Sequence, residues 1–232
     1  MDIKFQPVKE DSQYFFNAPE PASKTVPKWF SKMPLYINGD KSFKFFPDGT
    51  VNQTVKTCSP FLDSFLTGYT ISLRVDLQVT IIDGQHHFLW KAGRPMEKHD
   101  SRQIVSEQTS NKYDKTPFKF MNEWVIRTPK NYSTLFVHPL NRTDLPFTTL
   151  SGVVETDSFK NPIHFPFVID KDFEGIIERG TPIVQLIPIK RESWRSSWIP
   201  YSKSDTFKAD VDYYGKLVKA YKSLHWKKKD YK

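Results

Sequence analysis

The sequence predicts an all-β protein, and three observations support this. Between Met121 and Trp194, short apolar runs alternate with turn residues and show no helical period. Glycine is sparse (9 residues) and proline abundant (17), which suits short strands joined by turns that proline fixes. From Tyr69 to Val79, apolar residues occupy the odd positions and mostly polar residues the even ones. That period is typical of a strand with one buried face.

Most of the predicted strands lie in the second half of the chain. The turn Asp83-Gly84 is expected to fold residues 68–82 back onto residues 86–90 as a hairpin. Another hairpin is predicted at residues 42–55, around Pro47-Asp-Gly49. The remaining strands are predicted at residues 122–127, 132–138, 153–154, 163–169 and 183–189. The longer ones should share one packed core.

Outside the core, the sequence predicts less regular structure. Residues 1–40 are expected to form an extended arm with one short helix at residues 26–33, because prolines are too frequent there for longer elements. Residues 41–200 form the predicted β core domain, interrupted by a long polar loop at residues 91–115. Residues 201–232 are predicted to form a basic C-terminal helix.

Charge and composition limit the expected partners. The formal net charge is +8, and seven lysines lie between residues 216 and 232. This segment would attract nucleic acid, but a solvated basic helix face is the favoured interpretation. No segment reaches the roughly 20 apolar residues of a membrane span, so no membrane partner is expected. The single cysteine, Cys58, excludes an internal disulfide, and we expect a soluble cytoplasmic protein.

Three motifs resemble those of one enzyme superfamily. The segment Gly152-Val-Val-Glu155-Thr-Asp157 is similar to the Gly-Val-Ile-Asp-x-Asp-Tyr motif of the dUTP pyrophosphatase and dCTP deaminase superfamily. Residues 66–71, Leu-Thr-Gly-Tyr-Thr-Ile, resemble its first motif, and residues 175–186 resemble its fourth. The order and rough spacing of the motifs match, over about half of the chain.

This resemblance implies a dUTPase-like β-clip or distorted jelly roll, and a homotrimer with sites shared between subunits. In that superfamily the acidic residue at the position of Glu155 activates water, and glycine amides hold the nucleotide. The superfamily's Arg-Ser-Gly phosphate motif and its Gly-rich C-terminal arm have no counterpart in this sequence. Ligand binding without dUTP hydrolysis is therefore the leading interpretation, and magnesium is implied only if nucleotides are hydrolysed. No resident metal is predicted, because the histidines lack the close spacing of a facial triad.

The predicted site combines the motif residues with a polar loop. Glu155 and Asp157 are the candidate catalytic residues, and Arg142 is the candidate donor that neutralises them. These three are expected to converge on one pocket at the ends of strands. A purely structural salt-bridge network that pins the loop is the equally weighted alternative. The other candidate ligand-binding residues are Asp144, His138, Gly68, Tyr69 and Gln185.

Nearly the whole chain also resembles a group of hypothetical proteins of tailed phages, notably those of marine bacteria. The shared landmarks include Pro27-Lys-Trp29, Leu135-Phe-Val-His-Pro139 and Trp226-Lys-Lys. The resemblance implies a viral protein in the host cytoplasm. Three functions stay open: a phage accessory protein that binds a small polar or nucleotide ligand, an active nucleotide hydrolase or deaminase-like enzyme, and a structural or assembly protein of the virion.

Overall fold

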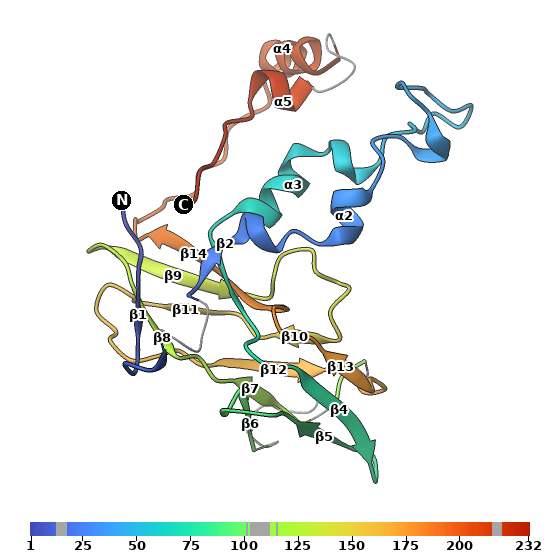
Figure 1. The fold of residues 1–232 in the computed structure, drawn as a ribbon. Helices are drawn as coiled ribbons and strands as arrows, with labels where there is room; N and C mark the ends of the chain where they lie inside the picture. Colours follow the sequence, from blue (N-terminus) through green and yellow to red (C-terminus); the bar gives the residue numbers. More distant parts are fainter. Residues whose placement is uncertain (13–17, 101, 103–111, 115, 215–219) are drawn as a thin grey trace. The chain divides into compact units, whose positions relative to one another are not determined.

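The computed structural model describes residues 1–12, 18–100, 102, 112–114, 116–214 and 220–232 (Figure 1). These residues divide into two compact units, which we describe separately. Unit 1 comprises residues 1–25, 67–191 and 231–232, and unit 2 comprises residues 26–66 and 192–230. This division differs from the predicted segments 1–40, 41–200 and 201–232, because residues 41–66 group with the later part of the chain rather than with the β core.

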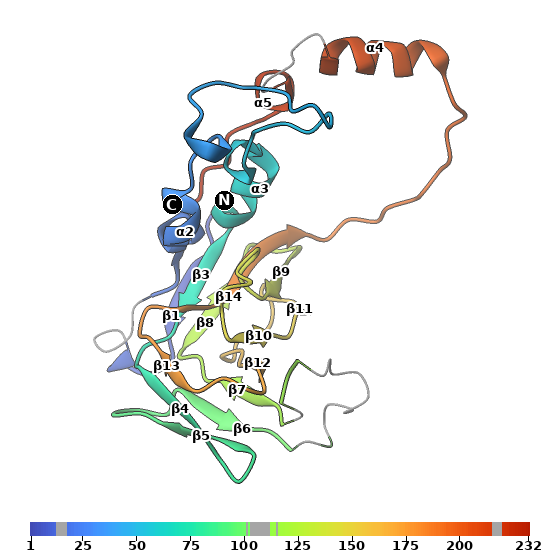
Figure 2. The same ribbon diagram turned by 90° about the vertical axis from the view of Figure 1, so that its right-hand side faces the viewer.

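Unit 1 confirms the all-β prediction, and its described strands form four antiparallel sheets (Figures 1 and 2). The largest sheet has the order β11-β9-β14-β3-β2 and consists of Gly152–Val154, Tyr132–Val137, Pro182–Lys190, Tyr69–Ser72 and Glu20–Pro21. The second has the order β10-β12-β7-β6 and consists of Phe147–Thr149, Phe165–Ile169, Phe118–Phe120 and Met96–Lys98. The third, β13-β4-β5, consists of Gly175–Ile177, Leu77–Ile82 and Gln85–Leu89. The fourth pairs β1 (Lys4–Pro7) with β8 (Trp124–Arg127).

Apolar side chains from these sheets form one core. The rings of Phe120 and Phe167 stack with their centroids 3.8 Å apart, and Phe147 lies edge-on to both. Leu77 of β4 and Val184 of β14 are completely buried in the same cluster. Burial of each such side chain contributes roughly 1.5–3 kcal/mol. The prediction that the longer strands share a core is therefore confirmed.

Residues 68–82, predicted as a single strand, form two strands in different sheets. The chain leaves β3 after Ser72 and enters β4 at Leu77. At the break, the backbone of Leu73 accepts a hydrogen bond from Gly180 N and donates one to Thr181 O. The alternating pattern runs through the break because both strands bury their odd-numbered apolar residues. Periodicity alone therefore did not reveal the change of sheet.

The two predicted hairpins have different outcomes. Strands β4 and β5 form the first, and both Asp83 and Gly84 adopt the positive φ angles that its tight turn requires. Residues 42–55 form only isolated bridges, at Phe45–Val51 and Tyr36–Gln53. This segment is organised instead by the buried side chain of Asn52, which donates to Asp40 Oδ2 and the carbonyl of Ser42.

The predicted arm and loop contribute strands to unit 1. Strand β1 pairs with β8 and strand β2 with β3, so part of the extended arm belongs to the sheets. A short 3-10 helix, η1 (Ala22–Thr25), follows β2. Strand β6 falls within the predicted loop at residues 91–115. Much of the rest of that loop lies outside the described residues.

Aromatic packing organises the first part of unit 2. Helix α2 (Lys28–Lys32) confirms the predicted short helix, and α3 (Ser59–Leu66) follows two 3-10 turns, η2 (Ile37–Gly39) and η3 (Val55–Thr57). Phe30 of α2 is buried and packs against Phe61 and Phe65 of α3. Lys56 Nζ donates to the carbonyl of Phe30 at 2.7 Å, at the C-terminal end of α2. Cys58, just before α3, is exposed.

The predicted C-terminal helix appears as α4 (Lys203–Tyr214) and α5 (Ala220–Leu224), which contact each other. Residues 215–219 lie outside the described part of the chain. The helix ends at Leu224, short of the predicted boundary, because the side chains of Trp226 and Lys229 bond to Asp63 of α3. Among the described residues, no helix has both the length and the apolar character needed to cross a bilayer.

Candidate ligand-binding site

The residues predicted to converge on one pocket lie at opposite ends of strand β9. Its register with β11 pairs Gly152 with Phe136 and Val154 with Thr134. Glu155 and Asp157 therefore follow β11 near the Tyr132 end of β9. The loop with Arg142 follows the opposite, Val137 end. The structure therefore does not bring these two groups together, because strand direction and register place them at opposite ends of β9.

At the first end, Asp157 is neutralised by Arg191 rather than by Arg142. Arg191 donates from Nη1 to Oδ1 at 3.1 Å and from Nη2 to Oδ2 at 2.5 Å. The backbone of Asn131 also donates to Oδ2, at 2.9 Å. The hydrogen bonds from Arg191, the largest influence, hold the pKa of the Asp157 carboxyl below its usual value. The neighbouring carboxylate of Glu155 is exposed and has no bonded partner among the described residues.

At the other end, Arg142 and Asp144 bond to each other. The guanidinium donates to both carboxylate oxygens, at 2.8 and 2.9 Å. The ring of His138 accepts from Thr149 N at Nδ1 and faces the carbonyl of Arg142 at Nε2, 3.1 Å away. These contacts place the ring proton on Nε2, and burial lowers the pKa of His138. Together these bonds hold the loop in place.

The remaining predicted residues also serve the fold. Buried Gln185 donates from Nε2 to Thr67 O at 2.5 Å and accepts at Oε1 from Leu140 N at 2.9 Å. Gly68 has a φ of +74°, and a Cβ built on it would lie 2.0 Å from the carbonyl oxygen of Leu186. Tyr69 donates its hydroxyl hydrogen to the carbonyl of Lys232, and burial raises its pKa. These geometries explain the three residues without a ligand.

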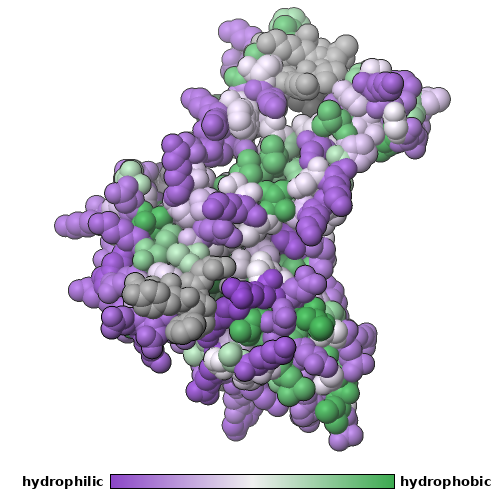
Figure 3. Space-filling model, in the orientation of Figure 1, coloured by the Kyte–Doolittle hydropathy of each residue, from purple (hydrophilic) through white to green (hydrophobic). Residues whose placement is uncertain are grey.

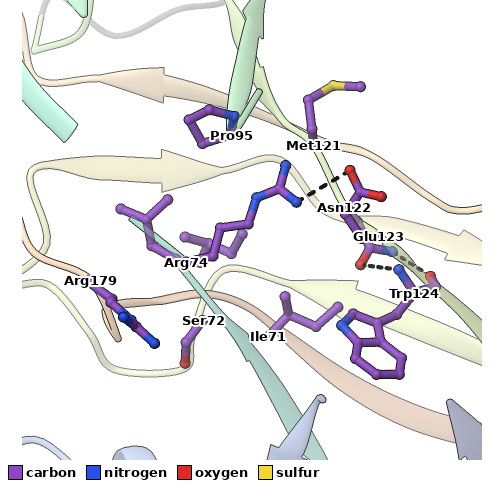
Figure 4. Close-up of a pocket in the computed structure, with 11 residues that line it drawn as sticks. Ile71, Ser72, Arg74, Pro95, Met121, Asn122, Glu123, Trp124 and Arg179 are labelled. Atoms are coloured by element: carbon purple, nitrogen blue, oxygen red, sulfur yellow. Dashed lines mark hydrogen bonds and ion pairs between the residues drawn. The ribbon is translucent and has the colours of Figure 1, made fainter. Parts of the chain in front are cut away.

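A cavity lies elsewhere in unit 1, beside the break between β3 and β4 (Figure 4). Its volume of about 30 Å³ has room for one or two water molecules. Two polar atoms in its lining, Ser72 Oγ and Trp124 Nε1, are buried and make no hydrogen bond with any described residue. An unsatisfied buried polar group costs about 1–3 kcal/mol, so it marks a place where an added polar molecule would gain hydrogen bonds.

Arg74 is one of the residues that line this cavity. The break after Ser72 turns its side chain inward, where it is 9% exposed. Its Nη2 donates to the carbonyl of Arg94 at 2.8 Å, and its Nη1 lies 3.2 Å from Glu123 Oε1. Figure 4 shows Arg74 facing Glu123, with Arg179 on the opposite side of the cavity from Trp124.

The cavity wall is braced by a buried side chain. Asn122 donates from Nδ2 to the carbonyl of Trp124 at 2.6 Å and accepts from Trp124 N at 3.0 Å. The backbone of Asn122 in turn donates to His164 Nδ1 at 3.1 Å. The indole of Trp124 therefore stands on a fixed backbone. Such preorganisation reduces the entropy lost on binding.

A larger cavity of about 510 Å³ adjoins the first, and Arg74 and Arg179 line both. Its volume falls within the roughly 300–1,000 Å³ of small-molecule sites. One wall is apolar, formed by Leu89, Trp90 and Ile176. Figure 3 shows hydrophobic residues gathered over the sheet β13-β4-β5, which carries this wall. Trp90 Nε1 donates to the carbonyl of Gly93 at 2.8 Å, which orients its indole.

Cations line the larger cavity. The side chains of Arg179 and Lys91 are exposed and have no bonded partner among the described residues. The acidic residue Asp76 accepts a hydrogen bond from the backbone of Arg179 at 2.7 Å. Free guanidinium and ammonium groups beside an indole suit a ligand that is anionic at one end and flat and apolar at the other.

The sequence contained only a weak signal for this site. Arg74 fits the polar face of the predicted strand, and Arg179 lies in the turn before β14, so neither stands out in the sequence as a ligand-binding residue. The feature that places Arg74 at the cavity is the break in residues 68–82, which turns its side chain toward the residues around Trp124. The alternation of apolar and polar residues does not show this break.

The described residues contain no group of three or more His, Cys, Asp or Glu side chains that could hold a metal ion. Comparison with known proteins found neither a protein-family model nor a curated protein sequence that matches this chain.

Proposed function

We propose that this protein binds a small anionic ligand with a flat apolar group, a nucleotide being the favoured example, in the paired cavities joined by Arg74 and Arg179. One observation carries the proposal. The two arginines line both a ligand-sized cavity and a smaller one in which Ser72 Oγ and Trp124 Nε1 are buried without partners. Cationic groups, an apolar wall and unsatisfied polar atoms thus meet in one place.

Each part of such a ligand has a partner in the site. Arg179 and Lys91 supply charge-assisted hydrogen bonds to phosphate or carboxylate oxygens. The flat group lies on the indole of Trp90 or against Leu89 and Ile176. A polar end, directly or through a bridging water, reaches Ser72 and Trp124 in the smaller cavity.

The proposed activity is binding without hydrolysis. The two carboxylates at the paired cavities hold the arginines, since Glu123 faces Arg74 and Asp76 accepts from Arg179 N. We therefore assign them to the placement of the arginines rather than to the activation of water. A magnesium ion would be required at the site only if the bound nucleotide were hydrolysed. The resemblance to tailed-phage proteins supports an accessory role in the host cytoplasm during infection.

Calorimetric titration of the full chain with dUTP, dCTP, ATP and inorganic triphosphate tests this proposal. We expect a nucleotide to bind more tightly than inorganic triphosphate, which has no flat group. Arg179→Ala should weaken binding about 10- to 100-fold, the value of a charge-assisted hydrogen bond. Trp90→Ala should weaken nucleotide binding about 5- to 100-fold and leave triphosphate binding unchanged.

Lys160→Ala is the matched control, because it removes one exposed positive charge outside the paired cavities. It should leave the affinity within about twofold, a change too small to indicate a lost contact. Thermal unfolding of each variant checks that the fold is intact. The proposal fails if no nucleotide binds at millimolar concentration, or if Lys160→Ala weakens binding as much as Arg179→Ala.

A further inference from the structure

The segment that follows strand β14 carries large exposed aromatic side chains. We define residues 192–214 as the C-terminal arm; residues 192–202 belong to no helix or strand and run as an extended chain into α4 (Figure 2). Trp194 is 86% exposed, Trp198 85% and Tyr201 77%. Aromatic side chains this exposed and this close together are unusual on a soluble surface and mark an interaction site.

Helix α4 points to the same conclusion. Its residues 203–211 are all exposed, including the apolar side chains of Phe207 and Val211. Helices shorter than about 12–15 residues are marginal in water without tertiary packing. The described part of α4 has 12 residues and contacts the short helix α5, and its residues 203–211 bury no apolar face. A partner that covers Phe207 and Val211 would supply that packing.

The exposed aromatic surface of the C-terminal arm is about as large as one side of a specific interface. Four aromatic residues of roughly 150–250 Å² each, at the exposures found here, give about 500–800 Å² per arm. A standard interface buries about 800 Å² per partner. One arm with its receiving surface is therefore enough for a stable contact, and a reciprocal exchange of two arms doubles the area.

Unit 1 carries a matching surface at strand β11. In the described part of the chain, β11 pairs with β9 alone, so its outer edge has unpaired backbone groups. Val153 of β11, and Leu150 and Phe159 on either side of the strand in the sequence, have exposed apolar side chains. An extended segment can add to such an edge as a further strand. The chain thus contains both an extended apolar segment and an edge that accepts one.

The starting point of the arm suggests which molecule provides the edge. Arg191, the last residue before the arm, pairs with Asp157, which follows β11. The origin of the arm and the receiving edge are therefore neighbours in one copy. A two-fold contact that brings these regions of two copies together places each arm beside the partner copy's edge.

We propose that the C-terminal arm of one copy docks on the β11 edge of a second copy, and that the exchange is reciprocal in a two-fold dimer. Charge supports this pairing. Glu155, at the end of β11, and Arg195, between Trp194 and Trp198, are both exposed and have no bonded partner among the described residues. Docking of the arm pairs these opposite charges between copies.

Sedimentation equilibrium of the full chain between 1 and 100 µM tests the dimer. We expect twice the chain mass of 27.2 kDa. The double variant Trp194→Ser/Trp198→Ser should raise the dimer dissociation constant about 100-fold or more, because buried tryptophans dominate interface energies. Val153→Arg on the receiving edge should weaken the dimer similarly. Circular dichroism and thermal unfolding check that both variants remain folded.

Two further variants sharpen the test. Ile82→Ser, which also replaces an exposed apolar residue but lies outside the arm and the β11 edge, should leave the dissociation constant unchanged. Glu155→Arg should weaken the dimer and the reversed pair Glu155→Arg/Arg195→Glu should restore it. A monomer at every concentration, a mass of three copies, or a dimer that survives either the tryptophan variant or Val153→Arg overturns the proposal.

Discussion

Polar side chains in this protein differ in whether their hydrogen bonds are complete. Gln185 and His138 each satisfy both polar ends within the fold. Ser72 Oγ and Trp124 Nε1 are equally hidden from solvent but make no bond to a described residue. Buried polar groups that make all their hydrogen bonds are typical of structural residues. Buried polar groups that lack hydrogen-bond partners are typical of sites that receive a ligand or a water molecule. This contrast moves the candidate site from the motif residues to Arg74 and Arg179.

His138 should make stability depend on pH. Burial lowers its folded-state pKa below the ordinary 6.5, so the unfolded chain binds the proton more readily. Its contribution is therefore present above pH 6.5 and is lost as the pH falls through its lowered folded-state pKa. Burial lowers the pKa of His164 in the same direction. Urea unfolding at pH 7 and pH 5 should show this loss of stability.

The variant His138→Gln keeps a donor and an acceptor but does not titrate in this range. Its free energy of unfolding should fall less between pH 7 and pH 5 than that of the wild type. His87→Gln, at an exposed position, is the control and should retain the wild-type dependence. Equal slopes for all three proteins would show that His138 does not cause the effect.

Among the elements, β9 separates the groups that were predicted to meet. Its six residues place Asp157 with Arg191 at one end and Arg142 with Asp144 at the other. Motif spacing along the chain does not show this separation. The loops before and after a strand leave from its opposite ends. Residues in these two loops therefore lie far apart unless another strand brings the chain back.

The close approach of β3 and β14 makes Gly68 a sensitive position. A Cβ there would meet the Leu186 carbonyl at 2.0 Å, and the φ of +74° disfavours any side chain. We expect Gly68→Ala to lower the free energy of unfolding by at least about 3 kcal/mol. Gly84→Ala, with a φ of +72° but open space around it, should cost only about 1 kcal/mol. Urea denaturation measures both, and similar losses would contradict the steric argument.

On the scale of the whole chain, unit 2 joins segments that are far apart in the sequence. Asp63 of α3 accepts a hydrogen bond from Trp226 Nε1 at 3.0 Å and pairs with Lys229. Asp63→Ala should speed proteolytic cleavage at residues 226–229 several-fold, because this segment loses its bonds to α3. Asp210→Ala, an exposed change in the same unit, is the control. Unchanged cleavage in Asp63→Ala would show that other contacts hold the segment.

Assembly is the other property at this scale. The resemblance to dUTP pyrophosphatases predicts a trimer, whereas the C-terminal arm and the β11 edge favour a pair. Sedimentation distinguishes the two, because their masses differ by one copy of the 27.2 kDa chain.

The sequence alone determined the local elements. Apolar runs predicted the strands near β9, β12 and β14, and Asp83-Gly84 predicted the hairpin of β4 and β5. Pro27, at a position where a helix can begin, and the helical spacing of Trp29 and Met33 predicted the short helix α2. These features depend on residues close in the chain, whose spacing directly reflects the strand or helix period.

Only the tertiary structure decided which side chains meet. Arg74 and Trp124 are 50 positions apart in the sequence, and they line one cavity because the chain changes sheets after Ser72. Asp157 pairs with Arg191 instead of Arg142 because register, rather than order along the chain, sets neighbours across a sheet. A one-residue difference in register or a break in a strand changes every such contact and leaves the local pattern intact. The candidate site belongs to this second class, since it consists entirely of contacts between segments distant in sequence.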